Sequence, residues 1–187
     1  MLQKLRALKN VVWSFFEVVE TLAVALVAVF LVRTFIAQPF LVSGGSMEPN
    51  FTNGNYLLVD ELSYRLREPE RGEIIVFKYP KNHKTFYIKR VIGLPGETIK
   101  VQGGKVEIQT ERGELPLKEE YIDPAWTSGN VDVTLGENEF FVMGDNRNFS
   151  YDSRSWGPVK ENEIVGIVRL RLWPVNEVMA FGKPAYE

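Results

Sequence analysis

The chain has 187 residues, enough for one domain with an appended segment, and its 22 basic and 24 acidic side chains give a net charge of −2. A net charge this small and negative produces no positive field that would attract nucleic acid. The absence of cysteine excludes disulfides, thiolate metal sites and a cysteine nucleophile. His83 is the only histidine, so metal sites built on paired histidines are excluded. A Ser-His-Asp triad is possible only if His83 belongs to it. We therefore expect no metal and no cofactor.

Most of the apolar excess lies in the first 42 residues. Residues 21–32 read TLAVALVAVFLV without a charge, and ten further residues back to Val11 extend the run. A helix needs about 20 apolar residues to cross a bilayer, so residues 11–38 are predicted as a membrane-spanning helix region. Pro39 lacks an amide donor and disfavours helix at the preceding residue, so we expect the helix to end near there.

Basic residues precede this run, at Lys4, Arg6 and Lys9. They predict that residues 1–10 are cytoplasmic and residues 39–187 extracytoplasmic, although Arg33 weakens the asymmetry. A cleavable signal peptide, a buried core helix and an interfacial amphipathic helix are the alternatives. The stretch RTFIAQP after the run is a poor cleavage site, so a single uncleaved span in the plasma membrane is favoured.

From Phe40 onward the helical period disappears and short runs rich in β-branched and aromatic residues follow. These predicted strands cover residues 56–59, 73–77, 86–92, 98–101, 105–108, 131–135, 139–143 and 164–172. The pair Gly103-Gly104 between two of them is typical of a tight hairpin. Residues 111–130 are polar and irregular and are expected to be a surface excursion. The sequence therefore predicts one mainly β domain with antiparallel sheets.

Three segments of this domain carry residues suited to chemistry, and the first is Ser43-Gly44-Gly45-Ser46-Met47-Glu48-Pro49. Glycines beside a serine allow unusual backbone conformations and close approach of a substrate. A hydroxyl beside free backbone N–H groups suits a nucleophile with an oxyanion hole. A flexible linker is the alternative, because linkers use the same residues.

The second segment is Phe86 to Glu97, which contains Lys89. In a strand, Tyr87, Lys89 and Val91 share one face. Burial between an aromatic ring and a valine lowers the pKa of a lysine, and a neutral amine can act as a base on a serine hydroxyl. The alternative is an edge lysine whose amine stays in water.

The third segment runs from Gly144 to Pro158, directly after an apolar strand, and holds two Asp and two Arg. Short polar side chains in loops usually satisfy backbone groups. The density of charged groups here favours a rigid, hydrogen-bonded loop.

Together the three segments resemble the type I bacterial signal peptidases, the leader peptidase family of Ser/Lys proteases. Ser46-Met47-Glu48-Pro49 matches the nucleophile box of that family, and Tyr87 to Gly96 matches its lysine box. Gly144-Asp145-Asn146-Arg147 through Asp152-Ser153-Arg154-x-Trp156-Gly157 matches its carboxy-terminal box. The similarity covers essentially the whole chain.

This resemblance implies a membrane-anchored serine endopeptidase that removes signal peptides from secreted and membrane precursor proteins. Ser46 would be the acylated nucleophile and Lys89 its general base, and Ser150 would orient the lysine. Asp152 and Arg154 would form a structural ion pair. The pockets for small residues at −1 and −3 of an Ala-x-Ala site would be lined by Phe40, Val42, Met47, Tyr87 and Ile88. Part of the apolar surface would rest on membrane lipid.

The chain departs from the best-known members at Gly44, where some carry a serine that donates to the oxyanion. The oxyanion hole would then depend on backbone N–H groups, chiefly that of Ser46. A self-cleaving repressor-like peptidase would need a DNA-binding domain, which is not visible in the sequence. An inactive anchored β module is disfavoured by the presence of both Ser46 and Lys89. His83 is expected in a solvated loop.

Overall fold

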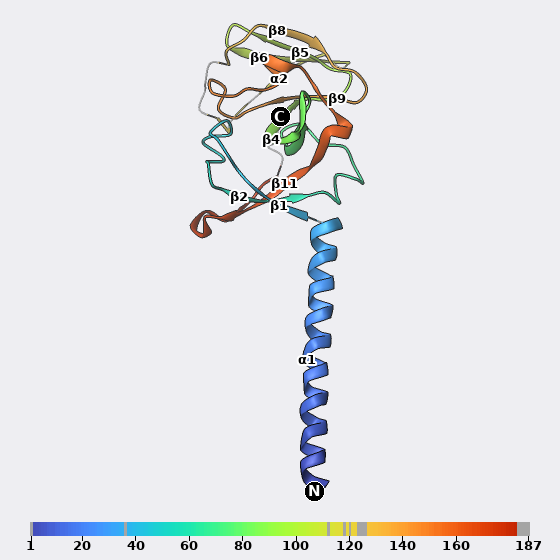
Figure 1. Ribbon diagram of the computed structural model, residues 1–187. Coiled ribbons are helices and arrows are strands. Elements are labelled where there is room, and N and C mark those ends of the chain that lie inside the picture. Colours follow the sequence, from blue (N-terminus) through green and yellow to red (C-terminus); the bar gives the residue numbers. More distant parts are fainter. Residues whose placement is uncertain are drawn as a thin grey trace. The chain divides into compact units, whose positions relative to one another are not determined.

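The computed structural model describes residues 2–35, 37–111, 113–117, 119, 121–122 and 127–182. It divides into two compact units, residues 1–37 and residues 38–187. The first unit is built around one helix and the second is almost entirely β (Figure 1). This confirms the predicted fold class.

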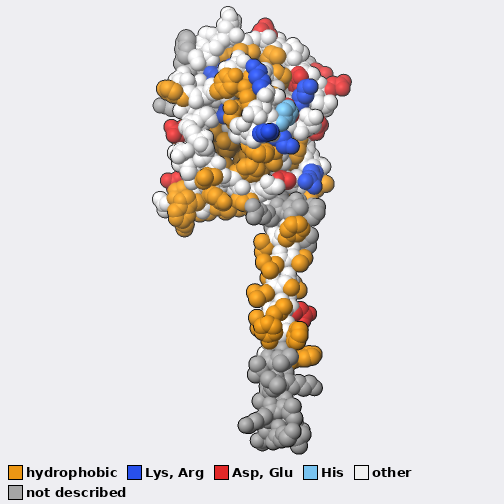
Figure 2. All heavy atoms as spheres, in the orientation of Figure 1, with side chains coloured by type: hydrophobic (Ala, Val, Ile, Leu, Met, Phe, Trp, Pro, Cys, Tyr) orange, Lys and Arg blue, Asp and Glu red, His pale blue; other side chains and the backbone are white. Residues whose placement is uncertain are grey.

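Helix α1 spans Leu2–Phe35. Its stretch Trp13–Phe30 has a mean hydropathy of 1.8, and none of that stretch is buried. Large apolar side chains are exposed around this stretch, and Figure 2 shows them along the coloured part of the helix. A helix that is apolar all round belongs in a protein core or in a membrane, and by length and composition this one can cross a bilayer.

The helix ends at Phe35, slightly before the predicted end near residue 38. The chain then enters strand β1, which covers Ala37–Leu41 and includes Pro39. Strand β1 lies at one end of its sheet. A proline is tolerated there because an edge strand can leave one amide position unpaired.

The larger sheet has eight strands in the order β1-β2-β11-β3-β4-β9-β10, with β12 also paired to β11. The antiparallel pairings are β2 with β11, β11 with β3 and β12, β3 with β4, β4 with β9, and β9 with β10. Besides β1, the bounds are β2 Tyr56–Asp60, β3 Ile74–Tyr79, β4 Asn82–Gly93, β9 Glu139–Met143, β10 Val159–Lys160, β11 Ile164–Trp173 and β12 Met179–Ala180.

The smaller sheet has the antiparallel order β7-β6-β5-β8. Its strands are β5 Thr98–Gln102, β6 Lys105–Thr110, β7 Gly113–Pro116 and β8 Val131–Thr134. Gly103 and Gly104 form the turn between β5 and β6, where both have positive φ angles of 59° and 83°. The predicted tight hairpin is therefore confirmed, because this backbone conformation favours glycine at both positions.

All eight predicted strands are present, and β1, β7, β10 and β12 are additional. Strand β7 lies inside residues 111–130, so the expectation of an irregular excursion was wrong there. Its sequence GELP has little strand propensity, but Leu115 pairs with Ile108 and packs against the core beneath the small sheet. His83 lies within β4 and not in a loop, although its side chain is exposed as expected.

Three apolar clusters form the core. The first lies under residues 42–51 and contains Val42, Met47, Phe51, Leu57, Val59, Ile74, Val76 and Val168. The second lies behind β4 and β9, and the third joins these strands to the smaller sheet. Alternate residues of β4 face different clusters: Ile88 packs against the first, and Tyr87 and Val91 pack against the second. Strand β4 is thus held on both faces, which fixes the position of Lys89.

Short helical turns complete the domain. Helix α2 covers Ser153–Trp156, and two 3-10 turns cover Glu161–Glu163 and Val175–Glu177. Helix α2 follows the polar segment after β9. The second 3-10 turn lies in the hairpin between β11 and β12.

Candidate active site

The segment that carries Ser46 follows β1 and is tied to the domain on both sides. The Val42 N–H donates to the Asn55 carbonyl at 2.9 Å, and the Gly44 N–H donates to Asn53 Oδ1 at 3.0 Å. Met47 is buried in the first core cluster. These contacts hold the segment in place, which distinguishes it from a flexible linker.

Gly44 has a φ of +98°, in the left-handed region that other residues rarely adopt. Apart from its two chain neighbours, no described residue has an atom within 4 Å of the position that a Cβ would take there. The glycine is therefore required by backbone conformation and not by lack of space. Its N–H is already engaged with Asn53, so it is not available as a donor to a substrate.

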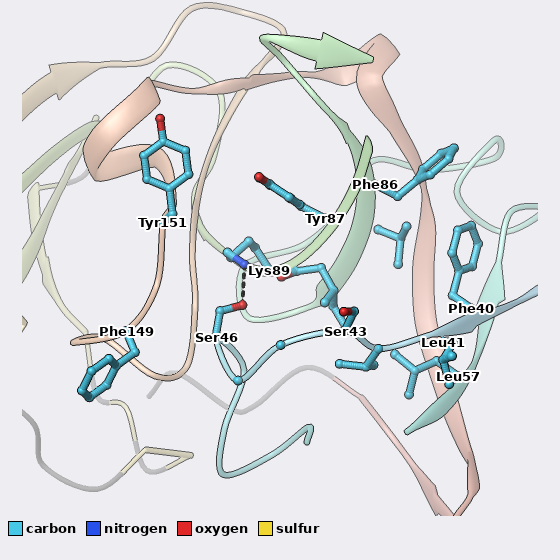
Figure 3. Close-up of a pocket in the computed structure, with 15 residues that line it drawn as sticks. Phe40, Leu41, Ser43, Ser46, Leu57, Phe86, Tyr87, Lys89, Phe149 and Tyr151 are labelled. Carbon is cyan, nitrogen blue, oxygen red and sulfur yellow. Dashed lines mark hydrogen bonds between the residues drawn. The ribbon is translucent and has the colours of Figure 1, made fainter. Parts of the chain in front are cut away.

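Lys89 lies in the middle of β4 with only 4% of its surface exposed. Its Nζ donates to Ser46 Oγ at 2.7 Å and to the Ile88 carbonyl at 2.9 Å (Figure 3). The same atom lies 5.5 Å from the centre of the Tyr87 ring. The structure therefore brings together two residues that are 43 positions apart in the sequence.

Burial lowers the pKa of Lys89 from 10.5 to about 8, because the charged amine loses its hydration. The carboxylates of Asp152 and Asp145 act in the opposite direction, but desolvation is the larger effect. An amine with this pKa is neutral in about a tenth of the molecules at pH 7. The neutral form can accept a proton from the hydroxyl it contacts.

Asp152 is fully buried at the start of helix α2, where its carboxylate caps the helix. It accepts hydrogen bonds from the Gly144 N–H at 3.1 Å and from Arg154 Nε at 2.8 Å and Nη2 at 2.8 Å. Burial alone would raise the pKa of Asp152, but the hydrogen bonds and charge of the Arg154 guanidinium, with smaller contributions from Ser150 and the Gly144 N–H, hold that pKa below its usual value. Arg154 also donates to the carbonyl oxygens of Arg147 and Ser128.

The loop after β9 is also bound to the Ser46 segment. The Asn146 N–H donates to the Ser46 carbonyl at 3.1 Å, and Asn146 Nδ2 donates to the Gly45 carbonyl at 3.1 Å. Asp145 pairs with the buried Arg90 of β4 through two hydrogen bonds of 2.7 and 2.8 Å. The loop, β4 and the Ser46 segment thus form one hydrogen-bonded unit. Sequence reasoning assigned no role to Asp145, Asn146 or Arg90, although their polarity beside buried strands was a usable signal.

Ser150 lies against this unit, but its contacts differ from the expected role. A Cβ on Gly144 would overlap both Ser150 Oγ and the Ser46 carbonyl oxygen, so the three residues are closely packed. The Ser150 hydroxyl is buried and finds no partner of good hydrogen-bond geometry among the described residues. The described hydrogen bonds of Lys89 go to Ser46 and Ile88. Orientation of the lysine by Ser150 therefore stays a prediction.

A cavity of about 350 Å³ opens beside Ser46 and Lys89. Phe40, Val42, Tyr87 and Ile88 line it, as do several residues that sequence reasoning did not select: Leu41, Leu57, Val76, Phe86, Phe149 and Tyr151. Met47, which was expected in the pocket, is not part of its lining: its side chain is buried in the same core cluster as Phe51 and Leu57. The arrangement is a largely apolar cleft with a serine hydroxyl and a lysine amine in its wall.

A serine hydroxyl in contact with a buried lysine amine inside an apolar cleft is an arrangement suited to a serine peptidase. Residues 15–173 match the family model described as "Signal peptidase, peptidase S26". The chain belongs to that family, and it is a signal peptidase, a hydrolase. The family resemblance found in the three sequence segments is thereby confirmed.

Two relatives known by sequence agree with this assignment. The chain is 39% identical over 172 residues to a probable signal peptidase I-2 of Synechocystis sp., covering 88% of this chain and 76% of that protein. It is 35% identical over 167 residues to signal peptidase I P of Bacillus subtilis subsp. natto, covering 86% and 90%. A crystal structure of a signal peptidase I from Enterococcus faecalis shares 31% identity and a TM-score of 0.46, covering 54% of this chain and 97% of that one.

Proposed function

We propose that the chain is a membrane-anchored serine endopeptidase that cleaves signal peptides from exported precursors with a Ser46/Lys89 dyad. The observation that carries this proposal is the 2.7 Å contact between Ser46 Oγ and the Nζ of a buried lysine whose pKa is about 8. A serine hydroxyl needs an adjacent base to become a nucleophile. His83 is no competitor, because its imidazole is 63% exposed and lies beside Glu163.

Acylation begins when neutral Lys89 takes the proton of Ser46 as Oγ attacks the carbonyl carbon of the scissile bond. The resulting oxyanion is held by the Ser46 N–H, which takes part in no hydrogen bond given for the residues that the structure describes. When the C–N bond breaks, the Lys89 ammonium returns the proton to the leaving amine. The signal peptide then remains as an ester on Ser46.

Deacylation repeats these steps with water. Lys89, neutral again, takes a proton from a water molecule as its oxygen attacks the ester carbon. The bond to Oγ breaks, and the proton passes from Lys89 to Ser46. The signal peptide leaves as a carboxylic acid, which releases its proton to the solvent, and both residues return to their starting states.

The walls of the cleft support a preference for small side chains before the scissile bond. Val42, Leu57 and Val76 belong to the packed core, so their side chains cannot move aside for a bulky group. Ile88 and Phe40 pack against the same cluster. We propose that this wall accepts Ala at −1 and −3, the Ala-x-Ala pattern, and rejects larger residues.

Helix α1 supports membrane anchoring through residues 11–35 of the predicted span 11–38. The basic residues Lys4, Arg6 and Lys9 favour residues 1–10 in the cytoplasm and residues 39–187 on the extracytoplasmic face of the plasma membrane. In this orientation the domain meets precursors as they emerge from the membrane. Protease added to intact spheroplasts should therefore digest the β domain, and protection of that domain would reverse the orientation.

Membrane lipid is a second proposed contact of the β domain. The β11–β12 hairpin exposes five large apolar side chains, and Figure 2 shows hydrophobic groups gathered over this hairpin, which Figure 1 draws in dark red. They are Leu172, Trp173, Val175, Val178 and Met179. Exposed apolar groups of this density favour a lipid surface.

Cleavage of a precursor with an Ala-x-Ala site by the purified protein in detergent tests the proposed activity. Wild type should release the mature protein, and Ser46→Ala should not. An inactive anchored β module would fail to turn over the precursor in either form. Equal cleavage by both forms would show that Ser46 is not the nucleophile.

A further inference from the structure

The cleft does not end at the catalytic pair. Phe149 and Tyr151, from the loop between β9 and α2, line the same cavity as Ser46 and Lys89. In Figure 3 they lie on the opposite side of Ser46 from Phe40 and Leu41. The proposed pockets for residues before the scissile bond and the proposed chemical steps use neither aromatic side chain.

Phe149 is 82% exposed, although its backbone is firmly held. Its N–H donates to the Asn146 carbonyl at 3.1 Å, and Asn146 in turn donates to the carbonyls of Ser46 and Gly45. One residue therefore connects the Phe149 backbone to the nucleophile segment. A single exposed phenylalanine is unremarkable on a protein surface, but here it is positioned beside the reacting atoms.

Tyr151 is held from the other side. Its hydroxyl lies 3.3 Å from that of Tyr79 on β3, and the two rings are in edge contact at 6.2 Å. Tyr79 packs on Tyr87, which lines the cleft beside Lys89. The cleft thus continues past Lys89 along an aromatic wall whose position is set by β3 and β4.

A peptide whose scissile carbonyl reaches Ser46 must extend in both directions from that atom. The residues before the bond occupy the wall formed by Phe40, Val42 and Ile88. An extended chain advances about 3.3 Å per residue, so the first three residues after the bond extend roughly 10 Å to the other side. That is the side on which Phe149 and Tyr151 lie in Figure 3.

We propose that Phe149, with Tyr151 beside it, binds an apolar side chain among the first three residues after the scissile bond. This inference rests on the proposed function, because it assigns the leaving segment of the same substrate. The occupant is the amino-terminal end of the mature protein. Contact with the exposed Phe149 ring removes apolar surface from water and favours aliphatic or aromatic residues over glycine.

The test uses peptides that share one Ala-x-Ala portion and carry Leu at the first, second or third position after the bond, against a Gly reference. Wild type should cleave at least one Leu peptide with about tenfold higher kcat/KM than the Gly peptide, as expected for one apolar contact. Phe149→Ala should reduce this ratio to between one and two, and Phe149→Leu should keep most of it. Leu66→Ala is the matched control, because Leu66 is also an exposed apolar loop residue, at 80%, and does not line the cleft.

The ratio for Ala against Phe at −1 is measured on every variant and reports whether the other half of the cleft is intact. The inference is wrong if wild type shows no preference at any of the three positions, or if Phe149→Ala keeps the wild-type preference. It is also wrong if both Phe149→Ala and Phe149→Leu no longer prefer Ala over Phe at −1. Phe149 would then support the structure of the whole cleft. Failure of the proposed function looks different: wild type would cleave none of the peptides, or Ser46→Ala would cleave them equally well.

Discussion

Burial of Lys89 should lower the stability of the folded chain, and Lys89→Met measures that cost. The environment lowers the pKa of Lys89 from 10.5 to about 8. A difference of this size corresponds to about 3 kcal/mol, at 1.36 kcal/mol for each tenfold change in proton affinity. Methionine is nearly as long, carries no charge and suits an apolar site. Lys89→Met should therefore be inactive but more stable than wild type at neutral pH.

The sign of the pH dependence follows from proton binding. Below pH 8 both the folded and unfolded wild-type chains carry a charged Lys89, so the full cost of about 3 kcal/mol is present. Between pH 8 and 10.5 the folded chain has lost this proton while the unfolded chain keeps it, so the stability of wild type rises relative to Lys89→Met. The difference in free energy of unfolding between Lys89→Met and wild type should therefore decrease by pH 10.5. What remains there is the part of the difference that does not depend on the charge of Lys89.

The free energy of unfolding is measured by urea titration of the full chain in detergent at pH 7 and pH 10, with tryptophan fluorescence as the signal. Loss of the hydrogen bonds from Nζ to Ser46 and Ile88 lowers the stability of the variant at both pH values, so the change between them is the decisive quantity. Lys78→Met is the control, because Lys78 is an exposed lysine on the neighbouring strand β3. A stability difference that is the same at both pH values, or precursor cleavage by Lys89→Met, would refute the reasoning.

Four further predictions concern the site. Ser46→Ala should lower precursor cleavage by on the order of 10⁶-fold without loss of folding, measured by gel assay; retention of a tenth of the activity would contradict it. Gly144→Ala should destabilise the domain by about 1–3 kcal/mol in urea and reduce turnover, because its Cβ would overlap Ser150 Oγ and the Ser46 carbonyl oxygen. Arg154→Ala leaves the buried Asp152 carboxylate without its paired cation and should lower the free energy of unfolding by about 3–5 kcal/mol. An unchanged midpoint in urea would contradict this prediction. A precursor with Phe in place of Ala at −1 should lose about 100-fold in kcat/KM, and equal processing of both would overturn the pocket assignment.

Much of the secondary structure follows from local patterns. The largely apolar run from Val11 to Val32 indicates the middle of helix α1, and the β-branched and aromatic residues in runs such as Phe86 to Ile92 mark them as β. Gly103-Gly104 alone identifies the tight turn between β5 and β6. These features depend on residues within a few positions of one another, so the sequence contains the information directly.

Short strands were beyond this kind of reasoning. Strands β10 and β12 have two residues each, and β7 contains a glycine and a proline. They are strands because a partner strand offers hydrogen bonds, as β9 does for β10. Met47 illustrates the same limit. The family motif predicted that it lines the substrate pocket, but it is buried in the core with Phe51 and Leu57.

The amino-acid sequence by itself determined the apolar helix, most of the strands and the identity of the residues proposed to react. Only the tertiary structure decided that the Nζ of Lys89 lies 2.7 Å from Ser46 Oγ, that its pKa is about 8, and that Phe149 lies across the cleft from Phe40. The physical reason is that the pKa of an amine depends on how much water surrounds it and on which charges are near. Those neighbours come from β4, the Ser46 segment and the loop after β9, which meet only when the larger sheet is assembled.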